Sequence, residues 1–141
     1  MSVSLPAEVL DKAAIVLTKL KAAGLMVVTA ESCTGGLVAA ALTAHSGSSA
    51  AVTGGFVTYS NAMKQSSLGV PATMLAEYGA VSEQVAAAMA AGALIRAEEA
   101  DISVSLTGIA GPDGGSKTKP VGLVWFGLQR RGKVALPLLH I

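Results

Sequence analysis

Hydrophobic and polar positions alternate along the chain with two periods, one typical of helices and one typical of strands. From Leu10 to Leu20, apolar residues recur three or four positions apart, which places them on one face of a helix. Pro6 suits a first helical turn, and Gly24 suits the left-handed residue just past a helix end. These signals predict a helix over residues 6–23.

Short apolar runs, bounded by glycine or polar residues, alternate with further helical segments. Asn61 and Ser82 stand where helix caps are expected, and Pro71 opens another helical piece. The predicted helices cover residues 6–23, 37–44, 62–68, 71–79 and 83–100, and the predicted strands cover residues 25–30, 56–59, 102–106, 121–128 and 134–139. Such alternation is the signature of an α/β domain. The last two strands predict a hairpin, and therefore a mixed rather than a purely parallel sheet.

The composition indicates a single domain, residues 1–141, with few charges. Hydrophobic residues make up 52% of the chain and charged residues 13%, and the net charge is +1. A surface with many alanines and few charges is poorly solvated. We therefore expect another subunit to cover part of it, in a homodimer or a higher homo-oligomer. Without a basic cluster or a long apolar run, neither a nucleic-acid partner nor a membrane span is expected.

The N-terminus and the cysteine and histidine content narrow the compartment and the cofactors. The first residues lack the basic start and apolar centre of a signal peptide, so we expect a cytoplasmic protein. Cys33 is the single cysteine, which excludes an internal disulfide. His45 and His140 are too few and too scattered for a zinc site, and no metal or other cofactor is expected.

A polar segment, Glu31-Ser32-Cys33-Thr34-Gly35-Gly36, lies where a predicted strand gives way to a helix. Such a junction points free backbone N–H groups outward, beside which the Ser32 hydroxyl has the surroundings that an acyl-transfer nucleophile requires. The N–H groups concerned are those near Thr34, Gly35 and Gly36. The alternative is a helix cap and turn without a catalytic role, because serine, threonine and glycine are common there. Cys33 is a rival nucleophile, but no histidine lies close in sequence to activate it.

A candidate base follows the strand that ends at Tyr59. Lys64 lies within the first two turns of the next predicted helix. Most lysines are solvated, and this is the alternative interpretation of Lys64. A catalytic lysine would point inward, with its pKa lowered by desolvation, and would take the proton of Ser32. The chain offers no convincing Ser-His-Asp set, so a serine hydrolase needs a lysine base, for which Lys64 is best placed.

A glycine-rich loop, residues 107–120, follows a predicted strand. Long loops in small domains are usually functional, and glycines allow a ligand to approach the backbone closely. The residues of this region that we expect to bind the substrate are Thr107, Gly108, Gly111, Gly114, Gly115 and Ser116. Lys117 and Lys119 are further groups able to meet a phosphate, although the loop has neither the Walker spacing nor a dinucleotide fingerprint. The alternative is a flexible surface loop with solvated lysines.

Four ordered blocks of sequence resemble the CinA C-terminal domain family over nearly the whole chain. The blocks are residues 30–36, residues 55–61 with Lys64, residues 79–82 and residues 107–122. The resemblance implies a three-layer α/β/α sandwich. Because characterised members are nicotinamide-nucleotide amidases, it also implies that nicotinamide mononucleotide is hydrolysed to nicotinate mononucleotide and ammonia, in pyridine-nucleotide recycling.

The resemblance also implies roles for individual residues, in a Ser/Lys mechanism without a metal. Ser32 matches the nucleophile of the family and Lys64 matches its base. Tyr59 matches a tyrosine near the site, and we hypothesise that it positions Lys64 or the substrate. The glycine-rich loop is then expected to hold the ribose phosphate of the nucleotide.

The chain departs from the family pattern at its C-terminus. Family members continue from the last strand into a Phe-x-Gly-Asp-Arg-like segment and a final helix, whereas this sequence ends at Ile141, before both. It resembles a stand-alone form, without the molybdopterin-binding-like domain that precedes this one in many members. An alternative of another class is a nucleotide-binding or regulatory module of the competence/damage-inducible type without turnover, which an assay of ammonia release would distinguish from an amidase.

Overall fold

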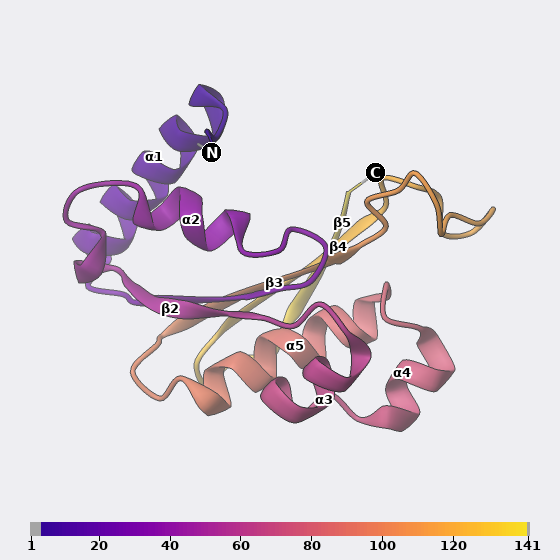
Figure 1. The fold of residues 1–141 in the computed structure, drawn as a ribbon. Coiled ribbons are helices and arrows are strands. Elements are labelled where there is room, and N and C mark those ends of the chain that lie inside the picture. Colours follow the sequence, from indigo (N-terminus) through magenta and orange to yellow (C-terminus); the bar gives the residue numbers. More distant parts are fainter. Residues whose placement is uncertain (1–3, 141) are drawn as a thin grey trace.

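A mixed sheet of five strands separates two layers of helices, which is the three-layer α/β/α sandwich expected from the sequence (Figure 1). The computed structural model describes residues 4–140. The strands are β1 (Val27–Glu31), β2 (Val52–Val57), β3 (Ile102–Gly108), β4 (Val124–Arg130) and β5 (Leu136–His140). The helices are α1 (Ala7–Ala23), α2 (Leu37–Thr43), α3 (Asn61–Leu68), α4 (Ala72–Tyr78) and α5 (Glu83–Arg96), with a short 3-10 turn, η1 (Ser48–Ala50). Helices α1 and α2 lie on one face of the sheet, and α3, α4 and α5 lie on the other.

The order of the strands creates a crevice at one edge of the sheet. The order is β2-β1-β3-β4-β5, in which β1 pairs in parallel with both β2 and β3, and β4 and β5 form the predicted antiparallel hairpin. The chain passes from β1 to β2 through α2 on one face, and from β2 to β3 through α3, α4 and α5 on the other (Figure 1). Because the two crossovers run over opposite faces of the sheet, a crevice lies outside the carboxyl ends of β1 and β3, where ligands of such sheets bind.

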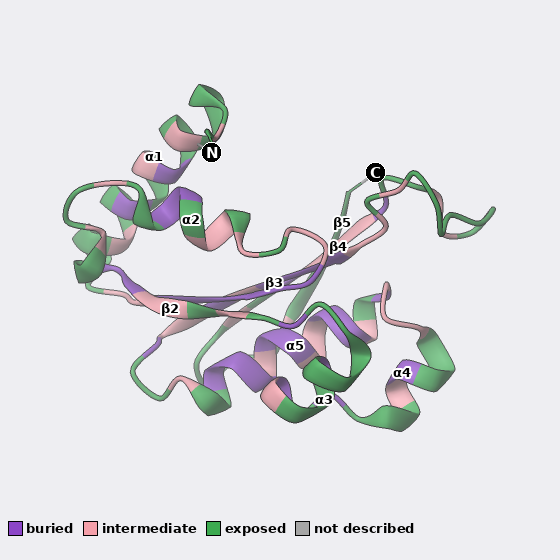
Figure 2. Ribbon diagram, in the orientation of Figure 1, coloured by how far each residue is buried: buried purple, intermediate pink, exposed green. Residues whose placement is uncertain are grey.

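Helix α5 packs closely on β3 because small residues meet at the contact. The hydroxyls of Ser103 and Ser105 are fully buried and donate to the carbonyls of Ala90 and Ala86, at 2.7 and 2.6 Å. Burial is greatest in the central strands and along the inner side of α5 (Figure 2). Helix α5 is therefore fixed against β3, and it supports α3, which packs on it.

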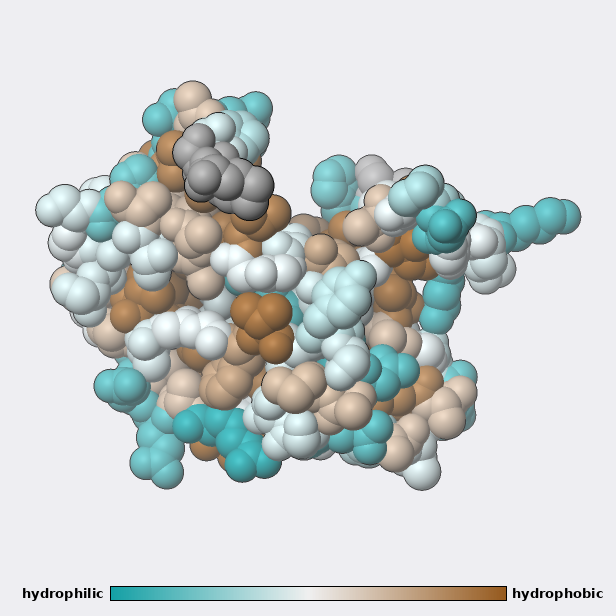
Figure 3. Space-filling model, viewed as in Figure 1, coloured by the Kyte–Doolittle hydropathy of each residue, from teal (hydrophilic) through white to brown (hydrophobic). Residues whose placement is uncertain are grey.

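The layer formed by α1 and α2 leaves apolar surface open. A cavity of about 570 Å³ with almost entirely apolar walls lies between α1, α2 and the sheet. Val9, Val16 and Leu37 from its walls are each exposed by more than 40%. Hydrophobic residues reach the surface beside α1 in the space-filling view (Figure 3). Within residues 4–140, no helix combines the length and the apolarity needed to cross a membrane.

Two boundaries near the crevice differ from those that the sequence predicts. Strand β2 begins at Val52 rather than at residue 56, because its pairing with β1 overrides the weak strand propensity of the two glycines within it. Helix α3 begins at Asn61, and its cap is Ser60, whose hydroxyl accepts the N–H of Met63 at 3.1 Å. The prediction that Asn61 is the cap was therefore wrong by one residue.

Two further boundaries differ because backbone turns intervene. Helix α5 ends at Arg96 rather than near residue 100, since Ala97 leaves the helical conformation and the guanidinium of Arg131 donates to the carbonyls of the last turn. Strand β4 begins at Val124 rather than at residue 121, because Gly122 has a positive φ of 93° within a tight turn. Neither turn carries a strong local sequence signal.

A glycine in α5 allows α3, the helix that carries Lys64, to come close. A Cβ atom at Gly92 would overlap the backbone carbonyl of Leu68, the last residue of α3. Glycine inside a helix costs about 1 kcal/mol relative to alanine, so its presence here reflects this close approach rather than helix stability.

We expect Gly92→Ala to destabilise the fold by about 1–3 kcal/mol, because the added methyl group forces α3 and α5 apart. The same substitution in an exposed helix would stabilise it by about 1 kcal/mol. Urea denaturation followed by circular dichroism measures the difference. A more stable Gly92→Ala variant would contradict the close contact between the two helices.

Candidate active site

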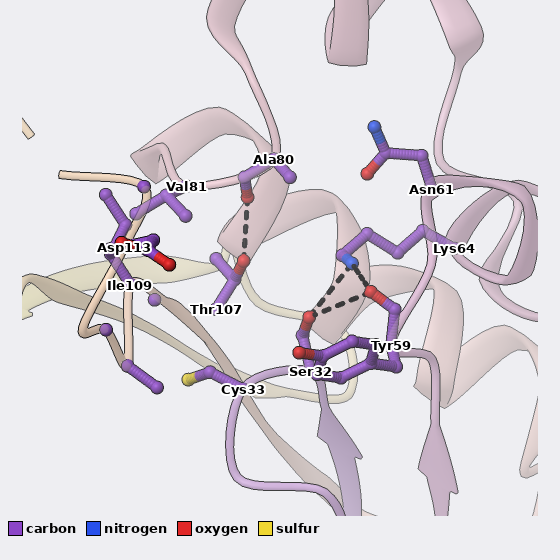
Figure 4. A pocket seen from close by; sticks show the side chains of 14 residues that line it. Ser32, Cys33, Tyr59, Asn61, Lys64, Ala80, Val81, Thr107, Ile109 and Asp113 are labelled. Carbon is purple, nitrogen blue, oxygen red and sulfur yellow. Dashed lines mark hydrogen bonds between the residues drawn. The ribbon is translucent and has the colours of Figure 1, made fainter. Parts of the chain in front are cut away.

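Three segments that follow strands meet at the crevice and enclose a cavity of about 340 Å³. Ser32 follows β1, Tyr59 follows β2, and Thr107 and Gly108 close β3. Figure 4 shows Ser32, Tyr59 and Lys64 together on one wall, with Ile109 and Asp113 on the opposite wall. The residues that line the cavity are Ser32, Cys33, Tyr59, Asn61, Lys64, Ala80, Val81, Thr107, Gly108, Ile109, Ala110, Gly111, Asp113 and Gly114.

The side chains of Ser32 and Lys64 are in contact. The Lys64 Nζ atom lies 2.9 Å from Ser32 Oγ, within reach for proton transfer (Figure 4). Lys64 is only 1% exposed and Ser32 is 7% exposed. The two residues stand 32 positions apart in the chain and are brought together by the parallel pairing of β1 and β2.

The surroundings of the Lys64 amine suit its neutral form. Nζ donates to the carbonyls of Thr58 and Tyr59, at 3.0 and 2.9 Å. A neutral amine has two N–H groups and one lone pair, so these carbonyls take both N–H groups and the lone pair is left to accept the proton of Ser32. Burial lowers the pKa of Lys64 from its ordinary value of 10.5, and the nearby Cys33 thiol opposes this effect more weakly.

The start of α3 determines the direction of the Lys64 side chain. Ser60 caps the helix, and the Lys64 N–H donates to the Ser60 carbonyl at 3.1 Å, which places Lys64 in the first turn on the inner face. Leu68, one turn further along, is 3% exposed and belongs to the core. Leu68 thus anchors α3 in the core, while Lys64 reaches the crevice.

Cys33 lies beside the nucleophile candidate but lacks its partners. Its side chain is half-buried and lines the cavity (Figure 4). Burial raises the pKa of the thiol, and the N–H groups of Cys33 and Thr34 oppose this effect. A raised pKa leaves the thiol protonated and weakly nucleophilic, so the geometry favours Ser32.

The loop between Ser32 and α2 differs from the expected exposed helix start. The Glu31 carboxylate is fully buried and accepts the N–H groups of Val38 and Ala39, both at 3.0 Å. The Thr34 hydroxyl donates to the same carboxylate at 2.6 Å. The predicted substrate-binding residues Thr34, Gly35 and Gly36 therefore do not line the cavity.

The third wall is formed by the end of β3 and the glycine-rich loop. Thr107 is buried, and its hydroxyl donates to the Ala80 carbonyl at 2.7 Å, which ties β3 to the segment before α5. A Cβ atom at Gly108 would come within 3.1 Å of the Cys33 sulfur and closer still to the Leu123 carbonyl, so this position requires glycine. Gly111 and Gly114 line the cavity, as the sequence predicts for this loop.

The end of the glycine-rich loop turns away from the cavity. Gly115 and Ser116, which we expected to bind substrate, do not line it. The Ser116 hydroxyl accepts the Lys119 N–H at 3.0 Å within a tight turn. The Lys119 ammonium group donates to the Tyr78 carbonyl at 2.6 Å, which fastens the loop to the end of α4.

Several cavity residues are ones that we did not single out as site residues. Ala80 and Val81 enter from the turn before α5, Asn61 from the start of α3, and Asp113 from the loop. Tyr59 contributes its carbonyl to the Lys64 amine, whereas its side chain is 74% exposed at the mouth of the cavity. For Ala80 and Val81, the signal in the sequence was the Gly-Ala-Val-Ser block at residues 79–82, which resembles the family. Within the described part of the chain, no three His, Cys, Asp or Glu residues come together to hold a metal ion.

The sequence and the fold match proteins of one family. A model of the CinA C-terminal domain matches residues 10–141. The nicotinamide-nucleotide amidohydrolase PncC of Enterobacter agglomerans is 62% identical over 108 residues, which are 77% of this chain and 65% of that protein. The PncC protein of Escherichia coli K12 is 60% identical over 107 residues, 76% of this chain and 64% of that protein. The matched part of the chain thus spans slightly less than two thirds of the length of these relatives.

Solved structures match the fold over almost the whole described chain. The competence/damage-inducible protein CihA from Agrobacterium tumefaciens superposes with a TM-score of 0.91 at 50% sequence identity. The match covers 99% of this chain and 83% of that one. The sheet and its helices are therefore those of an established superfamily of structures.

The buried amine makes the stability of the fold depend on pH. Because the pKa of Lys64 is lower in the folded chain than its ordinary 10.5, the folded chain binds fewer protons than the unfolded chain between these two pKa values. The free energy of unfolding therefore rises with pH in this window. The full stabilisation is present above the unfolded pKa and is lost as the pH falls through the folded one.

We expect Lys64→Met to remove this dependence, so that the free energy of unfolding rises less steeply towards pH 10.5, by up to about 1.4 kcal/mol per pH unit. Urea denaturation of both proteins over a pH series measures the slopes. Lys19→Met, at an exposed lysine of α1, should keep the wild-type slope. Equal slopes for all three proteins would show that the amine of Lys64 stays charged in the fold.

Proposed function

Because the chain belongs to the CinA C-terminal domain family, we propose that it is an amidohydrolase that converts nicotinamide mononucleotide to nicotinate mononucleotide and ammonia. The relatives named nicotinamide-nucleotide amidohydrolase support this substrate. The observation that carries the proposal is the 2.9 Å contact between Ser32 Oγ and the buried Lys64 Nζ. Such a reaction places the chain in pyridine-nucleotide recycling.

In the first step, the neutral Lys64 amine takes the proton of the Ser32 hydroxyl. The Oγ atom forms a bond to the carboxamide carbon of the substrate, and the carbonyl oxygen becomes an oxyanion. The carbonyls of Thr58 and Tyr59 accept hydrogen bonds from the ammonium group that results. They thereby stabilise the charge that the proton transfer creates.

The oxyanion needs N–H donors near Ser32. In the described part of the chain, the N–H groups of Cys33 and Thr34 donate to no backbone carbonyl, whereas that of Gly35 donates to the Ser32 carbonyl at 3.1 Å. The first two are close enough to the Cys33 sulfur to lower the pKa of the thiol, which itself lines the cavity. They are therefore the donors to which we assign the oxyanion.

Three further proton transfers at Lys64 complete the reaction. The Lys64 ammonium gives its proton to the amide nitrogen, the C–N bond breaks, and ammonia departs, so that the acyl group remains as an ester on Ser32. Neutral Lys64 then takes a proton from a water molecule, whose oxygen attacks the ester carbon. The bond between carbon and Oγ breaks, and Oγ takes the proton back from Lys64. The carboxylic acid that forms gives its proton to the released ammonia or to water and leaves as nicotinate mononucleotide.

The cavity accommodates the rest of the nucleotide. Its volume of about 340 Å³ lies within the range of about 300–1,000 Å³ that small-molecule sites occupy. Gly108, Gly111 and Gly114 allow a ligand to lie close to the backbone of the loop, where we place the ribose and its phosphate.

We expect Ser32→Ala to lower the rate of ammonia release from nicotinamide mononucleotide by at least about 10³-fold, because the nucleophile is lost. The fold should persist, since alanine fits the space. A coupled ammonia assay measures the rate, and Ser66→Ala, at an exposed serine of α3, is the control that should retain full activity. Undiminished turnover in Ser32→Ala would remove Ser32 from its role, and binding without any product in the wild type would favour a regulatory module.

We expect Lys64→Arg to lower kcat by about 10²–10⁴-fold, because arginine stays protonated and cannot act as a base. In the wild type, the rate should rise as the pH passes upward through the pKa of Lys64 and then reach a plateau, since only the neutral amine accepts the proton. Rates measured over a pH series test both statements. An active Lys64→Arg enzyme with the wild-type pH profile would argue against a lysine base.

A further inference from the structure

A buried carboxylate stands directly behind the nucleophile. Glu31 is the last residue of β1 and immediately precedes Ser32, and none of its surface is exposed. Its Oε1 atom accepts the Thr34 hydroxyl at 2.6 Å and the Val38 N–H at 3.0 Å, and its Oε2 atom accepts the Ala39 N–H at 3.0 Å. The carboxylate thus connects the end of β1 with the loop and with the first turn of α2.

Burying a carboxylate is costly, and the ordinary way to satisfy a helix start is a short polar side chain at its N-cap. Here the N-cap is Gly36, which has no side chain, and Thr34 gives its hydroxyl to Glu31 instead of capping the helix. Residues 32–36 therefore do not cap α2, and their backbone does not have to adopt the conformation of a side-chain helix cap.

The backbone of this loop leaves donors available at the cavity. Backbone bonds fix the rest of the segment: the Ser32 N–H donates to the Leu106 carbonyl at 2.9 Å, and the Thr58 N–H donates to the Glu31 carbonyl at 2.8 Å. Within residues 4–140, the N–H groups of Cys33 and Thr34 donate to no backbone carbonyl, and the acceptor near them is the Cys33 sulfur at the cavity. If the carboxylate were absent, the N–H groups of Val38 and Ala39 would lose their acceptor, and the Thr34 hydroxyl would lose the group that holds it.

We propose that Glu31 is a positioning residue of the deamidation: its buried carboxylate holds Ser32 and the Cys33 and Thr34 N–H groups in the arrangement that attack and oxyanion binding require. The inference rests on the proposed function. Glu31 acts through the backbone of the loop and not on the substrate, because it does not line the cavity.

An electrostatic role of Glu31 on the base would give a different result. A negative charge near Lys64 would favour its ammonium form and raise its pKa. The pKa of Lys64 is instead set by burial, opposed by Cys33. A positioning role therefore predicts a change in rate without a shift of the pH profile.

The test is Glu31→Gln, in which the amide offers one acceptor oxygen in place of two. We expect kcat for ammonia release to fall about 10- to 100-fold, KM to change less than about threefold, and the acidic limb of the pH–rate profile to stay where it is. Ser103→Ala is the matched control, since it removes another buried hydrogen bond of the sheet, far from the cavity, and should lower stability without lowering kcat. A kcat within twofold of wild type, or a rate restored by raising the pH, would overturn the proposal.

Thr34→Val keeps the test decisive if Glu31→Gln does not fold. It removes only the hydroxyl that donates to the carboxylate, and we expect it to lower kcat about 3- to 10-fold with an unshifted acidic limb. A Thr34→Val enzyme with wild-type kcat would count against the proposal.

Amide hydrogen exchange measures how firmly the loop after Ser32 is held, and the measurement needs no substrate. In Thr34→Val, and in Glu31→Gln where it folds, the peptide covering residues 33–39 should exchange at least about tenfold faster than in the wild type, whereas Ser103→Ala should leave it unchanged. Unchanged exchange in Thr34→Val would mean that Glu31 does not hold the loop. If the wild type releases no ammonia, the proposed function fails, while the exchange rates still decide whether Glu31 fixes this segment.

Discussion

The site depends on one buried amine. Lys64 is among the most completely buried side chains of the protein, and its three partners within hydrogen-bond distance are one hydroxyl and two carbonyl oxygens. A charged ammonium in this position would have no carboxylate to offset its lost hydration, whereas a neutral amine has a partner for each N–H group and for its lone pair. The cap at Ser60 and the close approach of α3 to α5 at Gly92 serve to keep the amine at this depth.

The topology explains why residues so distant in sequence meet. Strand β1 lies between β2 and β3, and all three are parallel, so their carboxyl ends bring Ser32, Tyr59 and Thr107 to one edge. Crossovers on opposite faces keep that edge open. The sheet therefore provides the crevice, α3 provides Lys64, the proposed base, and the glycine-rich loop provides a further wall.

Much of this could be predicted from the sequence. Apolar periodicity and the signals at helix ends located the five α-helices and the five strands but not the 3-10 turn η1, and the strand-to-helix junction at Ser32 and the lysine after Tyr59 were recognisable motifs. Two of the misplaced boundaries have a tertiary cause: strand pairing overrode local propensity in β2, and α5 ends where Arg131, distant in sequence, donates to its last carbonyls. That Thr34, Gly35 and Gly36 do not line the cavity could not be predicted, because the burial of Glu31 is a tertiary property. A glutamate beside a nucleophile motif does not reveal which N–H groups it will accept.

A lysine that acts as a base at neutral pH must be shielded from water, and a bound substrate adds to this shielding. A histidine base does not need such shielding to be neutral. With an unperturbed pKa of about 6.5, an exposed histidine is already mostly neutral at physiological pH, whereas lysine becomes neutral there only when its pKa is lowered, as burial does. Ser32 and Lys64 are already nearly dry in the open cavity, at 7% and 1% exposure. In the proposed reaction, an uncharged carboxamide beside Tyr59 would remove the remaining water from both side chains and favour the neutral amine further. The proposed base is therefore most fully in its neutral, proton-accepting form when the substrate is bound.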